Sequence, residues 1–406
     1  MVHKTMFLEP KHKDTDVLSL KNTPKDKVEL LQTLSYLEVY PKHKRQLLID
    51  ISGIKRYNSK TGIPRVVLKQ LEALQSLKQD LFEVRAIYLS EYPSTLPLHF
   101  YEDTHTPISL QNADIIYNPD LDPQSVKEAS IHKLYNSYKN IGVYIVTLIH
   151  DILPITHPHF FVKGQDQIHK EWLTHILAYS DLLITTSDET KTALQNYKTI
   201  KQPVYTIALG ATSFVPSQKN TSNKSATNFL VVSTIEPRKG HAQLLDAFEL
   251  LWQEGFDAQL TIVGKQGWNV EKLMERINTH PQKDKKLHYK AFVEDSILQE
   301  LYQNASALIV PSFAEGFGLP LIEAAHYHTP IIARNISVFH EIADNAAFYF
   351  SDTEDAQLLA NTIKEWYALY QEDSHPKSDT LSFSTWDENV KKIFHVLCEV
   401  FEVTPT

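Results

Sequence analysis

Short apolar runs alternate with longer, helix-length segments along most of this 406-residue chain. Runs rich in Val, Ile and Leu, typical of buried parallel strands, occur at 47–51, 84–88, 115–117, 143–149 and 182–186. A second series lies at 229–232, 259–263, 307–310 and 330–333. Strands that alternate with helices predict an open parallel sheet covered on both faces, and two series predict two such Rossmann-like α/β domains.

The segments outside these two series complete the predicted organisation. An N-terminal extension covers residues 1–44, the first domain 45–212 and the second domain 229–384. Residues 213–228 are rich in Ser, Thr, Asn and Lys without periodicity, which indicates a linker. Parallel sheets bind ligands at the carboxyl ends of their strands, so we expect the site in a cleft between the domains.

The N-terminal extension differs from the rest of the chain. Its first 23 residues are polar and irregular, while apolar residues from Val28 to Leu37 have the spacing of a helix that begins near Pro24. This helix either packs against the first domain or contacts a protein partner or a membrane surface. Both interpretations remain open at this stage.

Composition excludes several classes of protein. The formal net charge of −9 argues against a nucleic-acid partner, because phosphate neutralisation needs concentrated Lys and Arg. Cys398 is the single cysteine, so neither a disulfide framework nor a cysteine-based zinc site can form, and a cytoplasmic location is expected. We see no signal-peptide core and no apolar run of membrane-spanning length, which leaves peripheral contact at the inner membrane face as an option.

The few glycines mark the predicted ligand-binding edge. The chain has 11 glycines, under half of the average share of roughly 7%, and seven of them follow predicted strand ends. The most informative stretch runs from Pro311 to Ala324 and combines a strand end, a glycine loop and a helix that starts near Pro320. Its free N–H groups would bind an anion, while Glu315 and Glu323 would accept hydrogen bonds from hydroxyl groups.

A second polar stretch, from Ser233 to Gly240, also follows a strand directly. Arg238 offers a fork of donors and Lys239 a compact charge, a combination that suits the several oxygens of a diphosphate. In a protein of net negative charge, this adjacent pair at a strand end predicts a local anion site.

Together these residues resemble the retaining, nucleotide-sugar-dependent glycosyltransferases of family four, which have the two-domain GT-B fold. The resemblance extends from about residue 46 to 401 and depends on the Glu-x7-Glu spacing of Glu315 and Glu323. Supporting motifs in the same order are 150–151 (His-Asp), 236–240 (Glu-Pro-Arg-Lys-Gly), 263–268 and 291–293 (Ala-Phe-Val). The long loop around Gly53 and Gly62 is similar to a subset that contains bacterial mannosyl- and rhamnosyltransferases.

The resemblance implies roles for individual residues. Arg238 and Lys239 would bind the donor diphosphate, Glu323 the ribose and Glu315 the transferred sugar. Backbone groups of Phe317, Gly318 and Leu319 would line the sugar and phosphate, and those near Phe292 and Val293 the base. His150 would lie beside the reacting sugar, with Asp151 to orient it, and Gly62 would lie near the diphosphate. Residues 385–406 would form a terminal helix that crosses back to the first domain.

The expected activity is transfer of a hexose with retained configuration. GDP-mannose is the first donor to consider, before dTDP-rhamnose and UDP-sugars, and a glycan or lipid-linked glycan of a surface polysaccharide is the expected acceptor. The reaction expected by resemblance uses no cofactor and no metal ion, because the leaving phosphate itself takes the acceptor proton.

The sequence also contains patterns that are typical of other functions. Asp120 and Asp122 form an Asp-x-Asp pattern and His150, His157 and His159 form a histidine trio, but nearby prolines break any metal-ligand spacing. The chain lacks the G-x-G-x-x-G loop of an NAD oxidoreductase, and it lacks a lysine suited to a pyridoxal-phosphate phosphorylase. The remaining alternative is a catalytically inactive subunit that stabilises another transferase or presents its acceptor.

Overall fold

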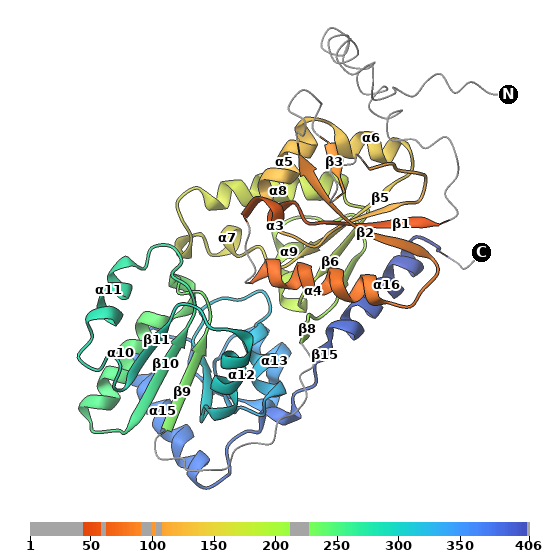
Figure 1. Ribbon diagram of the computed structural model, residues 1–406. Helices are drawn as coiled ribbons and strands as arrows, with labels where there is room; N and C mark the ends of the chain where they lie inside the picture. The colour runs from red at the N-terminus through yellow and green to blue at the C-terminus, as the bar shows by residue number, and fades with distance from the viewer. Residues whose placement is uncertain (1–43, 58–61, 91–98, 103–107, 212–226, 404–406) are drawn as a thin grey trace, which may run out of the picture.

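The computed structural model describes residues 44–57, 62–90, 99–102, 108–211 and 227–403. They form two α/β domains, each built on its own parallel sheet, that meet along a common boundary (Figure 1). The predicted helix near Pro24 lies outside the described residues, as does the predicted linker apart from Thr227 and Asn228. Those two residues begin the first strand of the second domain.

The N-terminal domain contains a seven-stranded sheet in the order β3-β2-β1-β4-β5-β6-β7. All neighbours are parallel except β2 and β3, which pair antiparallel. The strands are β1 (Arg45–Asp50), β2 (Phe82–Ser90), β3 (His99–Tyr101), β4 (Ile115–Asn118), β5 (Tyr144–Ile149), β6 (Leu182–Thr185) and β7 (Val204–Thr206). Its helices are α3 (Ser52–Tyr57), α4 (Ile63–Ser76), α5 (Pro123–Ile131), α6 (Leu134–Asn140), α7 (Leu153–Thr156), α8 (Gln165–Tyr179) and α9 (Asp188–Tyr197), with a 3-10 turn η2 (Pro158–Phe160).

The C-terminal domain repeats this plan with a six-stranded parallel sheet in the order β11-β10-β9-β12-β13-β14. The strands are β9 (Thr227–Val232), β10 (Ala258–Val263), β11 (Leu287–Lys290), β12 (Ala307–Val310), β13 (Ile331–Arg334) and β14 (Ala347–Phe350). Its helices are α10 (His241–Gln253), α11 (Glu271–Thr279), α12 (Asp295–Asn304), α13 (Leu319–His326), α14 (Ser337–Ala343) and α15 (Ala356–Gln371), with 3-10 turns η3 (Pro237–Lys239), η4 (Asp344–Ala346) and η5 (Ser378–Thr380).

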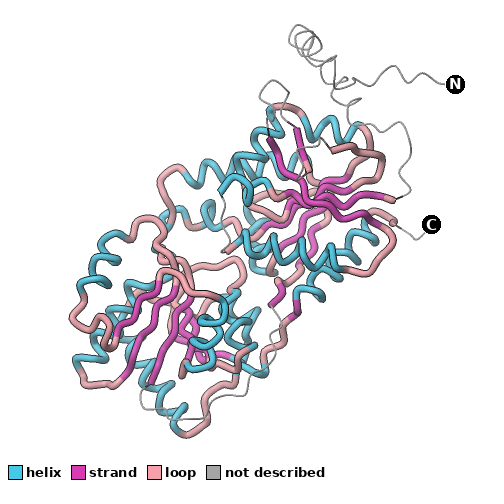
Figure 2. The backbone as a smooth tube through the Cα atoms, in the orientation of Figure 1, coloured by secondary structure: helices cyan, strands magenta, loops and turns pink. Residues whose placement is uncertain are grey.

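In each sheet the order in which successive strands are added reverses at one point. In the first sheet β1 lies between β2 and β4, and in the second β9 lies between β10 and β12. The connections on the two sides of β1 therefore run in opposite directions, and the same holds for β9. This leaves a crevice at the carboxyl ends of these central strands. The predicted α/β class with two Rossmann-like sheets is confirmed, and Figure 2 shows the two separate sheets with helices packed around each.

The final helix, α16 (Trp386–Val400), belongs to the N-terminal domain by its contacts. A short parallel pair of β15 (Ser384–Thr385) and β8 (Gly210–Ala211) precedes it, and a capping box of Thr385 and Glu388 closes its first turn. Gln70 on α4 donates from Nε2 to Asn389 Oδ1 at 3.0 Å, and Phe82 meets Phe394 edge to face. Buried apolar side chains of α16 thus complete the core beneath the first sheet.

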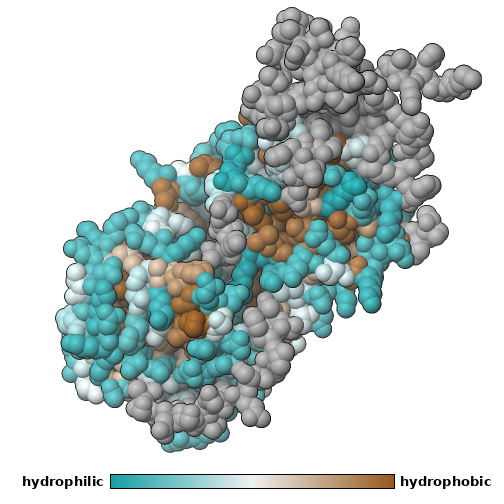
Figure 3. Space-filling view, in the orientation of Figure 1, coloured by the Kyte–Doolittle hydropathy of each residue, from teal (hydrophilic) through white to brown (hydrophobic). Residues whose placement is uncertain are grey.

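The face seen in Figure 3 is mostly hydrophilic, with an apolar area on the N-terminal domain. A small hydrophobic cluster of this domain includes Ile54, Ile63 and Ala86 of α3, α4 and β2, which are only partly buried. Among the described residues, no helix is both long enough and apolar enough to cross a membrane.

Candidate active site

Four charged side chains of the C-terminal domain form a compact cluster at the carboxyl ends of β9 and β12. Glu315 accepts from Arg238 Nη1 at 2.8 Å and from Lys239 Nζ, and Arg238 Nε lies 2.6 Å from Glu236 Oε1. All four side chains are at most 15% exposed. The structure therefore brings together the predicted residues Arg238, Lys239 and Glu315 in one place.

The ionisation of this cluster follows from its internal pairing. Burial alone would raise the pKa of Glu315, but Lys239 and Arg238 outweigh it and hold this pKa at about 2. Burial lowers the pKa of Lys239 and the neighbouring Arg238 adds to this, against the pull of Glu315. Burial raises the pKa of Glu236. The carboxylate of Glu315 thus stays ionised at neutral pH because two buried cations face it.

A close approach of two loops fixes this cluster in place. Gly240 ends the η3 turn with φ of 69°, and a Cβ atom there would lie 2.2 Å from the carbonyl oxygen of Pro311. Phe313 N donates to Arg238 O at 2.8 Å, and Arg238 Nη1 donates to Ala314 O at 2.9 Å. The loop after β9 and the loop after β12 therefore act as one unit.

The helix that follows the glycine loop begins where the sequence predicts it. Helix α13 starts at Leu319 with Pro320 in its first turn and Gly318 as the N-cap at φ of 107°. Phe317 is buried and precedes the cap. The backbone N–H groups of Phe317, Gly318 and Leu319 thus belong to the N-terminal end of α13, where partial positive charge favours an anion.

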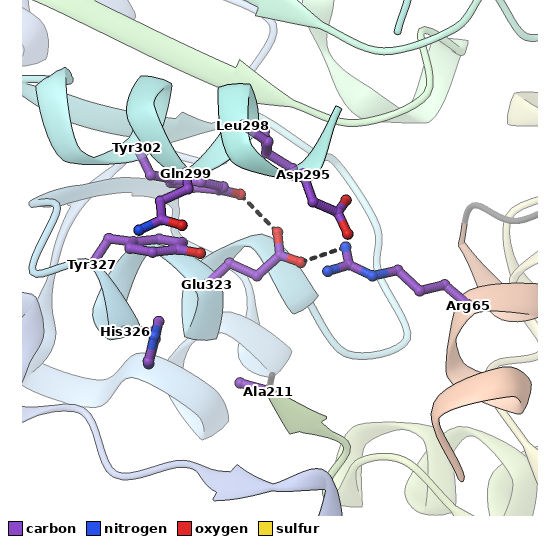
Figure 4. A pocket seen from close by; sticks show the side chains of 9 residues that line it. All are labelled: Arg65, Ala211, Asp295, Leu298, Gln299, Tyr302, Glu323, His326 and Tyr327. Carbon is purple, nitrogen blue, oxygen red and sulfur yellow. Dashed lines mark hydrogen bonds and ion pairs between the residues drawn. The ribbon is translucent and has the colours of Figure 1, made fainter. Parts of the chain in front are cut away.

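Glu323, the second carboxylate of the motif, has other partners. It accepts from Arg65 Nη1 at 2.9 Å and from the hydroxyl of Tyr302 at 2.8 Å. Figure 4 shows these side chains in a pocket between the domains, where Arg65 reaches across from α4 toward α13. Asp295, Gln299 and other residues of α12 and α13 complete its lining. Glu323 is therefore occupied by an arginine of the opposite domain.

His150 directly follows the β5 strand, which ends at Ile149, and is buried at the domain boundary. Its Nε2 lies 2.8 Å from the carbonyl oxygen of Pro119. A carbonyl only accepts hydrogen bonds, so Nε2 carries the proton and Nδ1 is left as an acceptor. Burial lowers the pKa of His150 despite this contact, which keeps the ring neutral at neutral pH. His150 can thus accept a hydrogen bond from a hydroxyl group at Nδ1.

Three further predicted residues lie at the margins. Phe292 is 70% exposed, whereas Val293 beside it packs against the core, just before α12. Gly62 is the N-cap of α4 with φ of 68°, and residues 58–61 before it lie outside the described ranges. Their proposed contacts with a base and a diphosphate remain predictions.

The two metal-like patterns have other uses here. Asp122 caps α5 by accepting from the backbone N–H of Gln124, and His150 is paired with Pro119 as above. Within the ranges that the structure describes, no three His, Cys, Asp or Glu side chains are grouped as metal ligands.

Sequence reasoning missed several polar residues that contact the site. Arg65 follows the loop at Gly62 closely, but nothing in its local sequence indicates that its side chain pairs with Glu323 of the opposite domain. Ser187 has the signature of a helix N-cap, which gave no hint that its hydroxyl also reaches the carbonyl of Gly316 at 2.6 Å. Such contacts between distant segments leave no trace in local spacing.

Comparisons with known proteins bear on this site. Residues 216–379 match the family model described as glycosyl transferases group 1. The chain is 36% identical over 379 residues to the serotype-specific mannosyltransferase WbdA of Escherichia coli, which covers 87% of this chain and 45% of that protein. It is 27% identical over 231 residues to O-antigen chain mannosyltransferase B of Escherichia coli, which covers 54% of this chain and 60% of that protein. The chain thus spans about half the length of the WbdA proteins that it matches.

Solved structures show the same fold. Sucrose-phosphate synthase from Thermosynechococcus elongatus superposes with a TM-score of 0.67 at 15% identity and covers 89% of this chain and 100% of that one. HepE from Anabaena, in complex with UDP and glucose, gives a TM-score of 0.58 at 16% identity and covers 88% and 97%. These likenesses confirm the predicted two-domain GT-B architecture.

Proposed function

We propose that the chain is a retaining mannosyltransferase, because residues 216–379 match the family model of the group 1 glycosyl transferases and the chain is 36% identical to WbdA. It moves a mannosyl residue from a nucleotide-sugar to a hydroxyl group of a glycan or lipid-linked glycan in surface polysaccharide biosynthesis. GDP-mannose is the first donor to test. Three WbdA proteins and two O-antigen chain mannosyltransferases among its relatives support this choice.

The buried cluster of Arg238, Lys239 and Glu315 beside the start of α13 is the observation that carries the proposal. Two cations and a helix N-terminus at one strand edge suit a diphosphate, and a carboxylate between them suits the hydroxyl groups of a sugar. In this structure Glu315 accepts the hydrogen bonds that Arg238 and Lys239 would donate to a diphosphate. When the nucleotide-sugar binds, Arg238 and Lys239 therefore pair with its phosphates, and Glu315 binds hydroxyl groups of its sugar.

The proposed reaction breaks the bond between the anomeric carbon and the phosphate oxygen and forms a bond to the acceptor oxygen on the same face. The acceptor proton passes to the leaving phosphate, and a nucleoside diphosphate is released. Negative charge grows on that phosphate in the transition state, so Arg238, Lys239 and the N–H groups of α13 stabilise the transition state more than the ground state. Their loss lowers kcat.

His150 and Glu323 bind the donor in this proposal. His150 accepts a hydrogen bond from a sugar hydroxyl group at Nδ1, because its hydrogen bond to Pro119 O places the ring proton on Nε2. Glu323 accepts from the ribose hydroxyls once Arg65 releases it. Backbone near Phe292 and Val293 is the proposed contact for the base, and Gly62 lies at the start of the helix that carries Arg65.

We also propose that catalysis needs no divalent ion. Arg238 and Lys239 supply the positive charge that a metal supplies to a diphosphate in other sites. Full activity after treatment with EDTA is the expected result, and recovery of a lost activity by Mg²⁺ or Mn²⁺ would contradict it.

Donor binding is the first test. We expect thermal unfolding to shift upward with one family among GDP, UDP, dTDP and their sugars, by about 2.7 kcal/mol in stability at 100 times the dissociation constant. Lys239→Met keeps the buried aliphatic volume and should abolish that shift. Lys364→Met removes an exposed lysine paired with Glu254 and should leave the shift intact.

Transfer itself is the second test. Release of nucleoside diphosphate from the stabilising donor, with added glycan acceptors, should be lost in Lys239→Met and kept in Lys364→Met. A folded protein that binds no nucleotide and turns over no donor would instead favour the inactive partner subunit.

A further inference from the structure

Three hydroxyl groups at the start of α9 join the two halves of the candidate site. Ser187 Oγ donates to Gly316 O at 2.6 Å, and Thr186 and Thr190 Oγ1 each lie 3.3 Å from the same oxygen. The same two threonines reach His150 O at 3.0 and 3.3 Å. All three side chains are buried. One hydroxyl cluster of the N-terminal domain thus contacts the glycine loop of the C-terminal domain and the backbone of His150.

The two backbones it contacts are themselves pressed together. A Cβ atom at Gly316 would lie 2.3 Å from His150 O and 2.8 Å from Asp151 Cβ. The carbonyl oxygens of His150 and Gly316, which lie in these packed backbones, need hydrogen-bond donors, and the hydroxyls of Thr186, Ser187 and Thr190 provide them. Without these donors, contact between the loops would bury unpaired acceptors.

A second, charged contact lies at the same helix end. Glu341 on α14 accepts from the backbone N–H groups of Asp188 and Glu189 at 2.7 and 3.0 Å. A carboxylate at the first turn of a helix is favoured by its orphan N–H groups and partial positive charge. The start of α9 is therefore bound by the C-terminal domain at two places, through hydroxyls to Gly316 and through N–H groups to Glu341.

We propose that Thr186, Ser187 and Thr190, with Glu341, are positioning residues that assemble the active site when the domains close. The cluster holds the Gly316 peptide against His150, so that the N–H groups after Gly316 and the imidazole of His150 face one sugar. This inference rests on the proposed function for its catalytic consequence, but the closure itself does not depend on it. The hydroxyls act through backbone atoms and need not touch the substrate.

Isosteric variants separate this role from simple stability. Thr186→Val and Thr190→Val remove a hydroxyl without changing volume, and Glu341→Gln removes only the charge. Thr185→Val is the matched control, because Thr185 is the buried preceding residue and its hydroxyl contacts Thr206 at 3.3 Å. Ser187→Ala also removes a helix cap, since Ser187 accepts from Thr190 N, so Ser187→Thr serves as the rescue that restores both functions.

Kinetics give the first readout. In the double variant Thr186→Val/Thr190→Val we expect kcat to fall about 10- to 100-fold, while donor KM stays within about threefold, because the donor contacts lie mainly on the C-terminal domain. The control Thr185→Val should keep wild-type kcat. An unchanged kcat in the double variant, with active wild type, would overturn the inference. An inactive wild type would count against the proposed function instead.

Domain closure gives a second readout that needs no activity. Spin labels at Asn140→Cys and Lys272→Cys, both exposed, report the distance between the domains in a Cys398→Ser background. We expect the double variant and Glu341→Gln to broaden this distance distribution toward longer values, as Gly316→Ala should by steric force. Thr185→Val should match the wild type. Distance distributions that stay unchanged in both the Thr186→Val/Thr190→Val variant and Glu341→Gln would show that these contacts do not hold the domains closed.

Discussion

The two sheets place acidic side chains at the carboxyl ends of equivalent strands, but the pKa values of Asp50 and Glu315 are shifted in opposite directions. In the C-terminal domain, Glu236 and Glu315 follow the central strands β9 and β12. In the N-terminal domain, Asp50 ends the equivalent strand β1, and Asp120 follows β4 shortly after its end. Both pairs thus lie at the point where the strand order reverses.

Buried cations make the difference between the two pairs. Arg238 and Lys239 hold the pKa of Glu315 at about 2. Burial raises the pKa of Asp50 to about 7 and that of Asp120 to about 6, and nearby acids add to both shifts. The nearby cation of the N-terminal crevice, Arg56, lies at its solvent-exposed edge. Its Nε is 3.4 Å from Asp122 Oδ2, and its side chain is 32% exposed.

The comparison teaches that strand topology provides a crevice but that the neighbouring cations decide its chemistry. The C-terminal crevice keeps the Glu315 carboxylate charged, because Arg238 and Lys239 pair with it. The N-terminal crevice instead favours the protonated form of its carboxyl groups, so the pKa values of Asp50 and Asp120 lie closer to neutral pH than that of an ordinary aspartate.

Removal of Glu315 is expected to have the largest effect. Glu315→Gln leaves Arg238 and Lys239 buried without their nearest counter-charge, so we expect a loss of about 3 to 5 kcal/mol in the unfolding free energy of the C-terminal domain. Chemical denaturation followed by domain-resolved hydrogen exchange measures it.

The pH dependence of this loss has a definite sign. The folded pKa of Glu315 is lowered, so its stabilisation is present above its ordinary value of 4.5 and disappears as pH falls toward about 2. The wild type and Glu315→Gln should therefore converge in acid. Glu249→Gln, which removes a more exposed partner of Arg276, should cost far less.

Removal of Asp50 should act in the opposite direction. The folded pKa of Asp50 is raised, so the wild type loses stability as pH rises from about 4 to about 7. Asp50→Asn keeps an acceptor for Ser52 N and Oγ and should be more stable at pH 8, by up to about 4 kcal/mol at about 1.4 kcal/mol per pKa unit.

A pH series of thermal unfolding curves tests this prediction. The difference between Asp50→Asn and the wild type should vanish near pH 4 and be largest above pH 7. Asp80→Asn, which alters a fully exposed carboxylate, should show no such trend. A variant that is less stable than the wild type at pH 8 would mean that the Asp50 carboxylate is compensated by partners, as Glu315 is.

Removal of the rim cation should have the smallest effect. Arg56→Gln breaks ion pairs with Asp122 and Glu128, at 3.4 and 3.1 Å, but the guanidinium is partly solvated. We expect a cost of at most about 1 kcal/mol, and this cost should shrink in high salt. A loss above about 2 kcal/mol in urea denaturation would instead identify Arg56 as the counter-ion of the first crevice, and the contrast between the two domains would narrow.

Much of the fold could be predicted because buried parallel strands appear in the sequence as continuous apolar runs. The runs at 47–51 and 307–310 became β1 and β12 with little change in their bounds. The four edge strands β3, β7, β11 and β14 were missed, because three or four residues at a sheet edge do not produce a recognisable run.

The candidate site divides in the same way. Arg238, Lys239 and Glu315 follow strands directly, so topology alone brings them to one edge, and the structure places them in contact. The pairing of Arg65 with Glu323 could not be predicted, since 258 residues separate them and the contact depends on how two domains meet. The raised pKa of Asp50 depends on burial, which its sequence neighbours do not reveal.

The position of α16 has a consequence for the order in which the protein is made. The first sheet is complete when β7 ends at Thr206, yet the helix that covers its core ends at Val400. At about 5 to 20 residues per second, a ribosome needs roughly 10 to 40 s to add the residues between these points. During that interval the nascent first domain exposes the apolar surface that α16 will cover. By the time α16 is made, the second domain already has all its strands, because β14 ends at Phe350. The domain synthesised first is thus the one that finishes folding last.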